Sequence, residues 1–261
     1  MVERVTGNPW RTLRRFTDAR IGMGRAGVSL PTAELLAFQM AHAQARDAVH
    51  QPLDVARLVN DLALVARALP AVCVQSQAVD RADYLRHPDK GRRLAQGAVL
   101  PADAPELALV IADGLSSRAV QDHAAAVVSA LIAQLPDVRM SAPVIAVQGR
   151  VAIGDDIAAR MNAAAVLVLI GERPGLSSPD SLGLYFTQSP GPGLTDARRN
   201  CISNVRPAGL LPERSAARFA YLYAQAQVLG TSGVALKDNS AALDALGDAA
   251  ATSFLTPPIK A

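Results

Sequence analysis

Apolar side chains in the first hundred residues recur at spacings of three and four, which is the repeat of an amphipathic helix. One helix is predicted to begin at Thr32, whose side chain is of a type that caps helices. A second is predicted from about Leu53 to Leu69, and Pro70 should end it because proline cannot continue the helical hydrogen-bond ladder. Residues 1–100 are therefore predicted to form a smaller, helical N-terminal region.

A different pattern begins after a proline-bearing linker at residue 101. Short continuous apolar runs occupy residues 107–112, 144–147, 165–170 and 182–186, and helical patterns separate the first three. Buried strands that alternate with helices are typical of a parallel sheet covered on both faces. We therefore predict an α/β domain over residues 101–238, with a mainly parallel, Rossmann-like sheet flanked by helices.

The last strong helical pattern begins near Pro212 and ends at Gly230, a residue type that commonly follows the last helical turn. Residues 239–261 are rich in alanine and then in proline, and we predict that they form a loosely ordered tail. The expected organisation is thus three parts, with boundaries near residues 100 and 238.

Composition narrows the class of protein. Half of the residues are hydrophobic and 19% are charged, which is enough for a buried core. The formal net charge is only +3, without the basic stripe typical of nucleic-acid binders. The longest apolar run, residues 163–170, is far shorter than the roughly 18 residues of a membrane span. Two cysteines suit a reducing cytosol, so we expect a cytoplasmic protein.

The carboxyl ends of the predicted strands are the expected place for a ligand, because open α/β sheets bind ligands in the crevice beyond those ends. Three loops there contain glycine and polar groups, namely residues 113–116, 148–151 and 171–175. The long segment 187–211 contains no apolar run and is expected to fold as a loop over the same edge.

Two polar residues in these segments are candidate functional groups. Glu172 ends a buried strand, where a carboxylate needs hydrogen-bond donors; the alternative is a simple turn in which local hydrogen bonds hold Glu172 and Arg173. Cys201 could be a reactive thiolate beside Arg198 and Arg199, although a lone buried thiol is the commoner outcome.

Other motifs give weaker evidence for a binding or catalytic site. The segment Gly22–Gly27 spells G-x-G-x-x-G, but it lacks the preceding strand and the following helix of a dinucleotide loop, which favours a flexible, arginine-bearing loop. His123 could act as a base, but no nucleophile accompanies it. The spacing of histidines and cysteines predicts no metal site, and no catalytic set is recognisable.

Several segments, taken in chain order, form a distinctive set: Pro9-Trp-Arg-Thr-Leu-Arg-Arg-Phe-Thr-Asp-Ala-Arg20, Gly24-Arg-Ala-Gly27, Ala43-Gln-Ala-Arg-Asp-Ala-Val49, Ala112-Asp-Gly-Leu-Ser116, Gly171-Glu-Arg-Pro-Gly175 and Cys201-Ile-Ser-Asn204. Together they resemble the small (light) subunit family of ethanolamine ammonia-lyase, from about residue 9 to residue 238. The run around Gly171-Glu-Arg-Pro-Gly175 is the most specific of them. The tail beyond Asn239 lies outside the resemblance.

The resemblance implies an adenosylcobalamin-dependent enzyme that converts ethanolamine to acetaldehyde and ammonia by a radical route. In that family a large subunit, a (β/α)₈ barrel, holds the substrate and the radical-handling residues, and the small subunit completes the cobalamin pocket at the interface. Carried over position by position, the cobalamin contacts fall on Val151, Glu172 and Cys201. The resemblance implies no catalytic residue and no metal ligand in this chain.

Some cobalamin enzymes replace the cofactor's own base with a histidine from a D-x-H-x-x-G motif. None of the four histidines here has aspartate two residues before it, so we expect base-on cobalamin with no axial ligand from this chain. The arginine-rich N-terminus and the Gly22–Gly27 loop are candidates for docking onto the large subunit. Whether a bacterial microcompartment encloses the enzyme stays open.

Two other classes of function stay open at this point. One is a stand-alone α/β enzyme that acts on a phosphorylated metabolite through Asp113 and Arg173 at the strand ends. The other is an assembly subunit that binds no ligand.

Overall fold

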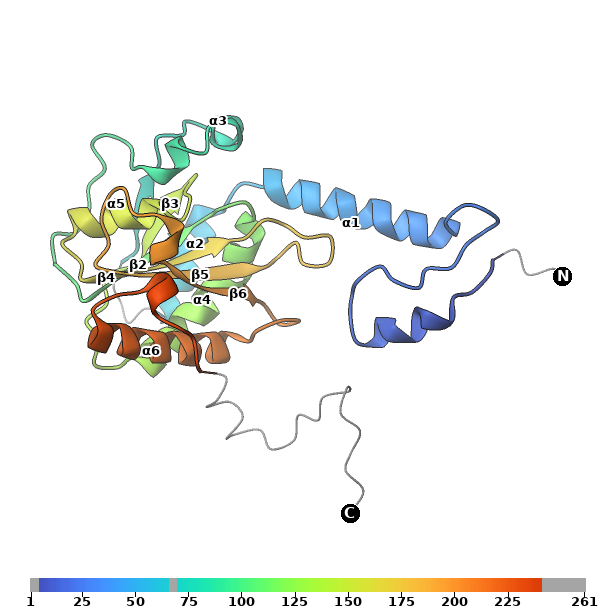
Figure 1. Cartoon of the computed structure of the whole chain (residues 1–261). Coiled ribbons are helices and arrows are strands. Elements are labelled where there is room, and N and C mark those ends of the chain that lie inside the picture. The colour runs from blue at the N-terminus through green and yellow to red at the C-terminus, as the bar shows by residue number, and fades with distance from the viewer. Residues whose placement is uncertain (1–4, 66–69, 241–261) are drawn as a thin grey trace, which may run out of the picture.

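A six-stranded sheet forms the centre of the structure, a computed structural model that describes residues 5–65 and 70–240 (Figure 1). The strands lie in the order β1-β3-β2-β4-β5-β6. Their bounds are β1 Val72–Gln75, β2 Leu107–Ala112, β3 Val144–Val147, β4 Ala165–Gly171, β5 Leu182–Gln188 and β6 Asn200–Val205. The chain thus belongs to the α/β class, as the alternation of apolar runs and helical patterns predicted.

The sheet is mixed, so the expectation of a mainly parallel, Rossmann-like sheet is not confirmed as it stands. Strands β1, β3, β2 and β4 pair in parallel, whereas β5 pairs antiparallel with both β4 and β6. The physical reason lies in the connection between β4 and β5. Parallel neighbours need a crossover of a dozen or more residues, usually a helix, and segment 172–181 is too short for one. The chain therefore turns back beside β4.

Two edge strands were not predicted from the sequence. Strand β1 lies within the region expected to be helical, and β6 lies within segment 187–211, which was expected to be a loop. Each buries few side chains, as is usual for an edge strand, and in β1 only Val74 is buried. In β6 only Ile202 and Val205 are buried. Backbone pairing with a neighbouring strand, rather than side-chain pattern, makes these segments strands.

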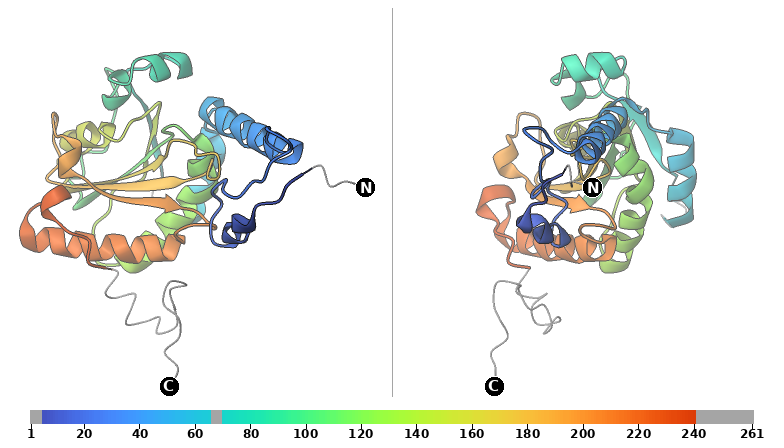
Figure 2. Two further views of the ribbon diagram at one scale, coloured as in Figure 1. Left: turned by 45° about the vertical axis from the view of Figure 1, so that its right-hand side comes forward. Right: turned by 90° about the vertical axis from the view of Figure 1, so that its right-hand side faces the viewer.

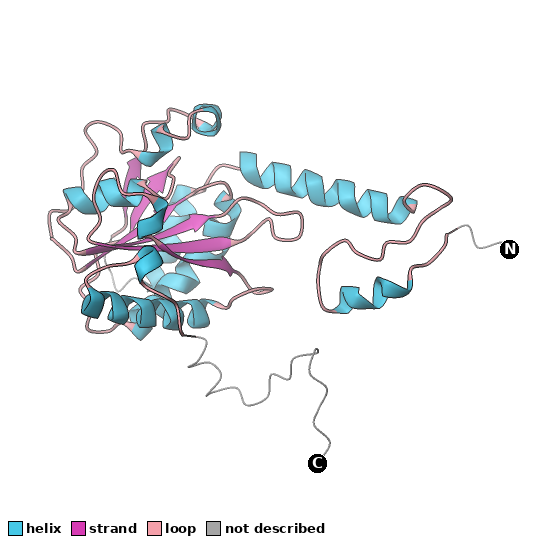
Figure 3. Ribbon diagram, viewed as in Figure 1, coloured by secondary structure: helices cyan, strands magenta, loops and turns pink. Residues whose placement is uncertain are grey.

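Helices cover both faces of the sheet (Figures 1 and 3). Their bounds are α1 Thr32–His50, α2 Val55–Val65, α3 Arg81–Arg86, α4 Ser117–Gln134, α5 Ile153–Arg160 and α6 Pro212–Leu229, with short 3-10 helices at Pro9–Arg15, Lys90–Arg92, Asp196–Arg198 and Gly233–Ala235. The predicted cap of α1 was wrong: Pro31 holds the capping position, without a side-chain hydrogen bond, and Thr32 is already helical. Among the described residues, no helix has both the length and the apolar character that a membrane span requires.

The core consists of two apolar layers, one on each face of the sheet. Helices α2, α4 and α6 pack on one face, where Leu109 and Phe186 of the sheet belong to the same apolar cluster as Phe219 of α6. Helix α5 packs on the other face against alternate residues of the same strands, such as Val110 and Val168. Every residue of β2 and β4 is buried, so neither face of these central strands is exposed to solvent.

The N-terminal segment extends away from the sheet as an arm (Figures 1 and 2). Helix α1 forms its stem, and the 3-10 helix Pro9–Arg15 lies near its outer end. The arm exposes several large apolar side chains, namely Trp10, Phe16, Val28, Leu36 and Met40. The predicted tail falls mostly on residues 241–261, which lie outside the described residues.

Phe219 offers a test of this packing. Its ring is fully buried and meets the Phe186 ring edge-on, with centroids 5.3 Å apart. Phe219→Ala should lower the free energy of unfolding by about 3–5 kcal/mol, because it leaves a cavity where the ring was. Val228→Ala, on the exposed side of the same helix, should change it by about 0.5 kcal/mol or less. Denaturant unfolding of both variants measures the difference; equal values would contradict this description of the core.

Candidate functional site

A cavity of about 430 Å³ opens at the carboxyl ends of β2, β3 and β4, where the sequence predicted a ligand crevice. Val151 follows β3 and Glu172 follows β4, and both line this cavity. Leu115 and Ile170 add apolar wall, and Tyr185 of β5 closes one side. The structure therefore brings two of the three predicted site residues into one hollow.

Backbone packing between two loops supports this cavity. Gly114, after β2, has a φ of +60°, and a Cβ there would overlap the carbonyl oxygen of Gly171 at the end of β4. The Leu115 N–H donates to that same carbonyl over 2.9 Å. Position 114 thus requires glycine for its backbone conformation and for the close approach of the two loops.

Asp113 joins the loops that carry the site. Its carboxylate is buried, and Oδ1 accepts the Gly149 N–H over 3.0 Å. Arg81 of α3 lies 3.5 Å from Oδ2 and also donates to the Gly114 carbonyl over 2.8 Å. Burial raises the pKa of Asp113, whereas Arg81 and the backbone N–H groups of Gln148, Gly149 and Gly114 act in the opposite direction. These contacts make Asp113 a structural link rather than a group open to a ligand.

Tyr84 of α3 forms a buried wall beneath Arg150. Its hydroxyl donates to the Gly149 carbonyl over 3.1 Å, and the guanidinium carbon of Arg150 lies 4.3 Å from the ring centroid. Burial raises the pKa of Tyr84, so the phenol stays a neutral donor. The Arg150 N–H donates to the Gly91 carbonyl over 2.7 Å. A Cβ at Gly91 would press on both side chains, so this contact also depends on glycine.

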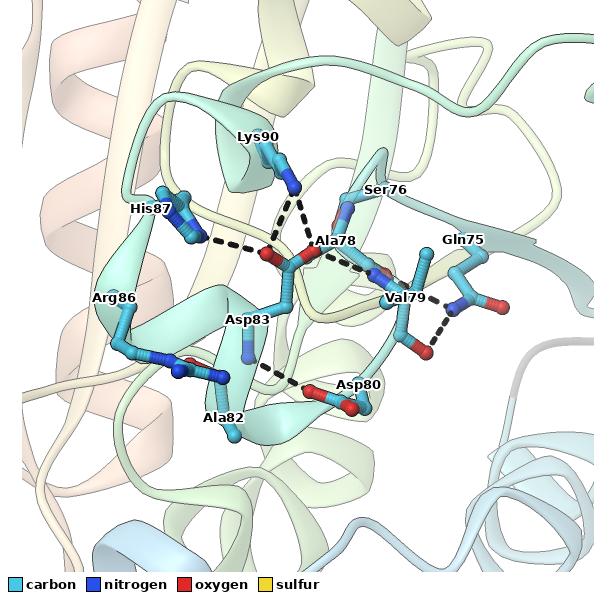
Figure 4. A network of polar contacts seen from close by, with 10 residues as sticks. All are labelled: Gln75, Ser76, Ala78, Val79, Asp80, Ala82, Asp83, Arg86, His87 and Lys90. Carbon is cyan, nitrogen blue, oxygen red and sulfur yellow. Dashed lines mark hydrogen bonds and ion pairs between the residues drawn. The ribbon is translucent and has the colours of Figure 1, made fainter.

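A polar network supports the helix that carries Tyr84 (Figure 4). Asp83 accepts from Lys90 over 2.8 and 3.0 Å, contacts His87 Nδ1 over 2.7 Å, and accepts the Val79 N–H over 3.1 Å. The Lys90 ammonium, then the Val79 N–H and His87, lower the pKa of Asp83 to about 2. Asp80 caps the helix by accepting the Asp83 N–H over 2.7 Å. The network fixes α3, and through it Tyr84, over the end of β3.

Glu172 has donors from two neighbouring strands. Its Oε2 accepts the Ser181 hydroxyl, directly before β5, and the Asn204 N–H of β6 over 3.3 Å. The alternative of a local turn with Arg173 is therefore wrong. Both hydrogen bonds fall on Oε2, and within the described residues Oε1 accepts none. One carboxylate oxygen of a half-buried glutamate thus stays free to accept from a ligand.

Cys201 lies on strand β6, not on a loop, and pairs with Tyr185 of β5. Tyr185 lines the cavity, so Cys201 lies one strand outside it. Its side chain is exposed, which contradicts the expectation of a buried thiol. Partial desolvation raises the pKa of the Cys201 thiol and the charge of Glu172 adds to this, although a hydrogen bond with Tyr185 acts in the opposite direction. A thiolate at neutral pH is therefore disfavoured.

Of the two arginines expected to stabilise a Cys201 thiolate, Arg199 has other partners. Arg199 is buried and forms ion pairs with Asp155 and, over 3.2 Å, with Asp196. Burial raises the pKa of Asp155 to about 6, although the Arg199 charge opposes this. This pair holds the start of β6 against α5 instead of activating a thiol.

A larger cavity of about 980 Å³ adjoins the first and shares Arg150 and Val151 with it. Segments 77–93, 150–160 and 192–199 supply its lining, which is rich in arginine. Sequence reasoning missed both Arg150 and Tyr84. Arg150 lies in loop 148–151, which was predicted to face a ligand, but nothing in the local sequence distinguishes Arg150 from its neighbours. Tyr84 lies on a short helix that has no recognisable sequence motif.

The remaining candidates lie elsewhere. His123 is buried on α4 and faces Asp180, with 3.4 Å between Nε2 and Oδ2. The Gly22–Gly27 loop pairs with Thr6 through Arg25, and from residue 5 onward no strand precedes it and no helix directly follows it. Within the described ranges, no three histidine, cysteine, aspartate or glutamate side chains are grouped to hold a metal ion.

Comparisons with known proteins agree over most of the chain. The family model for the ethanolamine ammonia-lyase light chain matches residues 7–237. An ethanolamine ammonia-lyase small subunit of Azotobacter vinelandii is 51% identical over 93% of this chain and 94% of its own length. Similar proteins with the same name from Ralstonia nicotianae and Rhodococcus erythropolis are 52% and 49% identical, over 90% and 89% of this chain and 90% and 91% of their own.

Alkylation tests the environment of Cys201. In a Cys73→Ser variant, Cys201 is the sole thiol, because the chain has two cysteines. Its raised pKa predicts slower reaction with iodoacetamide at pH 7 than in the same variant unfolded in guanidinium, and a rate that still climbs above pH 9. A rate that reaches its plateau below pH 8 would indicate an activated thiolate instead.

Proposed function

Because the chain belongs to the ethanolamine ammonia-lyase light-chain family, we propose that it binds adenosylcobalamin for a lyase that converts ethanolamine to acetaldehyde and ammonia. The chain is one subunit of that enzyme, and a large partner subunit holds the substrate and the radical-handling residues. This chain supplies no catalytic residue. Its proposed cofactor contacts are Val151, Glu172 and Cys201.

The observation that carries the proposal is the shared cavity beyond β3 and β4. Corrin is a broad apolar disc fringed with amides, so its site needs apolar wall and hydrogen-bond acceptors. Val151, Leu115 and Ile170 provide the wall, and the free Oε1 of Glu172 provides an acceptor for an amide N–H. These residues fit one side of the cofactor.

The size of the cavity supports a site shared between two subunits. Cavities of about 300–1,000 Å³ enclose drug-sized ligands. Adenosylcobalamin is larger, so a hollow of about 430 Å³ can hold only one side of it. Adenosylcobalamin supplies the radical chemistry when bound, and the proteins around it supply binding and orientation.

Cys201 fits this site from the rim. Its strand is the outermost of the sheet, next to Tyr185 and close to the Asn204 N–H that holds Glu172. A protonated, exposed thiol can donate to or contact an amide of the corrin without reacting with it. We assign it a contact role for that reason.

Base-on binding with no axial ligand from this chain is part of the proposal. The linings of both cavities include no histidine among the described residues. His87 is held by Asp83 and His123 faces Asp180, so both already have structural partners.

The N-terminal arm is the proposed contact with the large subunit. It extends away from the sheet (Figure 2). It exposes Trp10, Phe16 and Met40, and its 3-10 helix Pro9–Arg15 carries Arg14 and Arg15 in the last turn. Large apolar side chains gathered on one exposed segment commonly mark a protein interface. We place the enzyme in the cytoplasm.

The structure gives less support to a stand-alone enzyme that uses Asp113. That carboxylate is 3% exposed, and its oxygens already face N–H donors and Arg81. A ligand-free assembly subunit is the other alternative. Co-purification of the complex distinguishes it from our proposal, because cobalamin should be retained only when this chain is present if the chain binds the cofactor.

Activity of the separate parts tests the division of labour. The purified chain with adenosylcobalamin and ethanolamine should release no ammonia, and adding the co-expressed large subunit should produce turnover. Ammonia release is measured in both samples. Turnover by this chain alone would overturn the proposal.

A substitution at Glu172 tests the cofactor site. Glu172→Ala removes the free acceptor, and a hydrogen bond to a charged group contributes about 1.5–3 kcal/mol, so cobalamin affinity of the complex should fall roughly tenfold to a hundredfold. Glu213→Ala, an exposed glutamate on α6, is the matched control and should leave affinity unchanged. Absorbance titration with cobalamin measures both; equal affinities would show that Glu172 has no such role.

A further inference from the structure

The arginine-rich cavity beside the proposed corrin site has no role in the function described so far. Arg150 and Val151 line both cavities, so the two hollows meet at the loop after β3. A ligand that contacts Val151 from the smaller cavity would therefore have the larger one directly beside it. The chemistry of that larger lining indicates which part of a ligand it suits.

Each of the three carboxylates in the lining of the larger cavity is already paired with an arginine. Asp155 and Asp196 pair with Arg199, and Asp156 pairs with Arg160 over 3.1 Å. Three further lining arginines have no carboxylate partner within the described residues: Arg92, Arg93 and Arg150. The cavity thus has an excess of positive charge, which favours an anionic ligand.

Arg150 is held in place more firmly than the other two. Its backbone N–H binds the Gly91 carbonyl, and its guanidinium stacks on the buried ring of Tyr84. Its Nε is buried and has no hydrogen-bond partner. A buried guanidinium N–H without a partner is unfavourable, and a planar guanidinium suits phosphate oxygens because two of its N–H groups can donate in parallel.

Tyr84 gives that placement its rigidity. The Asp83 network fixes α3 (Figure 4). The Tyr84 hydroxyl is anchored to the Gly149 carbonyl, and the missing side chain at Gly91 leaves room for Arg150 against the Tyr84 ring. The position of Arg150 is therefore fixed before any ligand binds, which lowers the entropy lost on binding.

We propose that Arg150, assisted by Arg92 and Arg93, binds the phosphate group of the cofactor's nucleotide loop. This inference rests on the proposed function. The phosphodiester is the anionic group of adenosylcobalamin, and it lies between the corrin and the lower base. The smaller cavity would then hold the corrin edge at Val151 and Glu172, and the larger one the phosphate-bearing loop.

The test compares corrinoids with and without the phosphate, in the complex of this chain with its large subunit. Arg150→Met keeps an unbranched side chain over Tyr84 but removes the charge. The substitution should weaken cyanocobalamin binding at least tenfold. It should change the affinity for dicyanocobinamide less than twofold, because that corrinoid lacks the phosphate and the base. Binding of cobinamide phosphate should weaken as much as that of cyanocobalamin, because this corrinoid has the phosphate but not the base. Absorbance titrations give all three affinities.

Two further variants complete the experiment. Arg160→Met removes an arginine of the same cavity that is paired with Asp156, and should leave the preference for cyanocobalamin over dicyanocobinamide unchanged. Arg150→Lys should restore part of that preference, because it restores the charge without the planar guanidinium. If the Arg150 variants weaken binding of inorganic phosphate but do not change the preference for cyanocobalamin over dicyanocobinamide, the site binds free phosphate and the inference is overturned.

The outcomes separate this inference from the function on which it rests. If Arg150→Met weakens cyanocobalamin and dicyanocobinamide equally, Arg150 only supports the fold, and the proposed function stands without the inference. If the unaltered complex binds neither corrinoid, the proposed function itself fails.

Discussion

The buried carboxylate of Asp113 joins three segments that are far apart in the sequence. It accepts the Gly149 N–H from the loop after β3, lies in the loop after β2, and faces Arg81 of α3. These contacts compensate for burying a charge, which would otherwise be strongly unfavourable. The positions of Gly149, Arg150 and Val151 follow from this junction, and so do those of the two cavities that meet there.

The antiparallel half of the sheet gives the site its second wall. Because β5 turns back beside β4, Ser181 lies next to Glu172, and β6 adds the Asn204 N–H. A purely parallel sheet would have placed the start of β5 at the opposite edge, away from Glu172. The mixed topology therefore gives the glutamate its donors and keeps its second oxygen free for a ligand.

Most of the central fold could be predicted from the sequence, whereas its edges could not. The strands at residues 107–112 and 144–147 have the predicted bounds, because buried central strands are continuous apolar runs. Strands β1 and β6 have few buried side chains, so only their backbone pairing identifies them. For the same reason the sequence located the loops that bear Val151 and Glu172, but it placed Cys201 on a loop and gave no sign of Tyr84.

The sequence by itself determined the α/β class, the central strands, the cavity edge and the family, because apolar periodicity and motifs are properties of neighbouring residues. Only the tertiary structure decided the direction of β5, the donors of Glu172 and the stacking of Arg150 on Tyr84. Those features depend on pairing between segments that are distant along the chain. Tyr84 and Gly149 show this most clearly, since one hydrogen bond joins residues 65 positions apart.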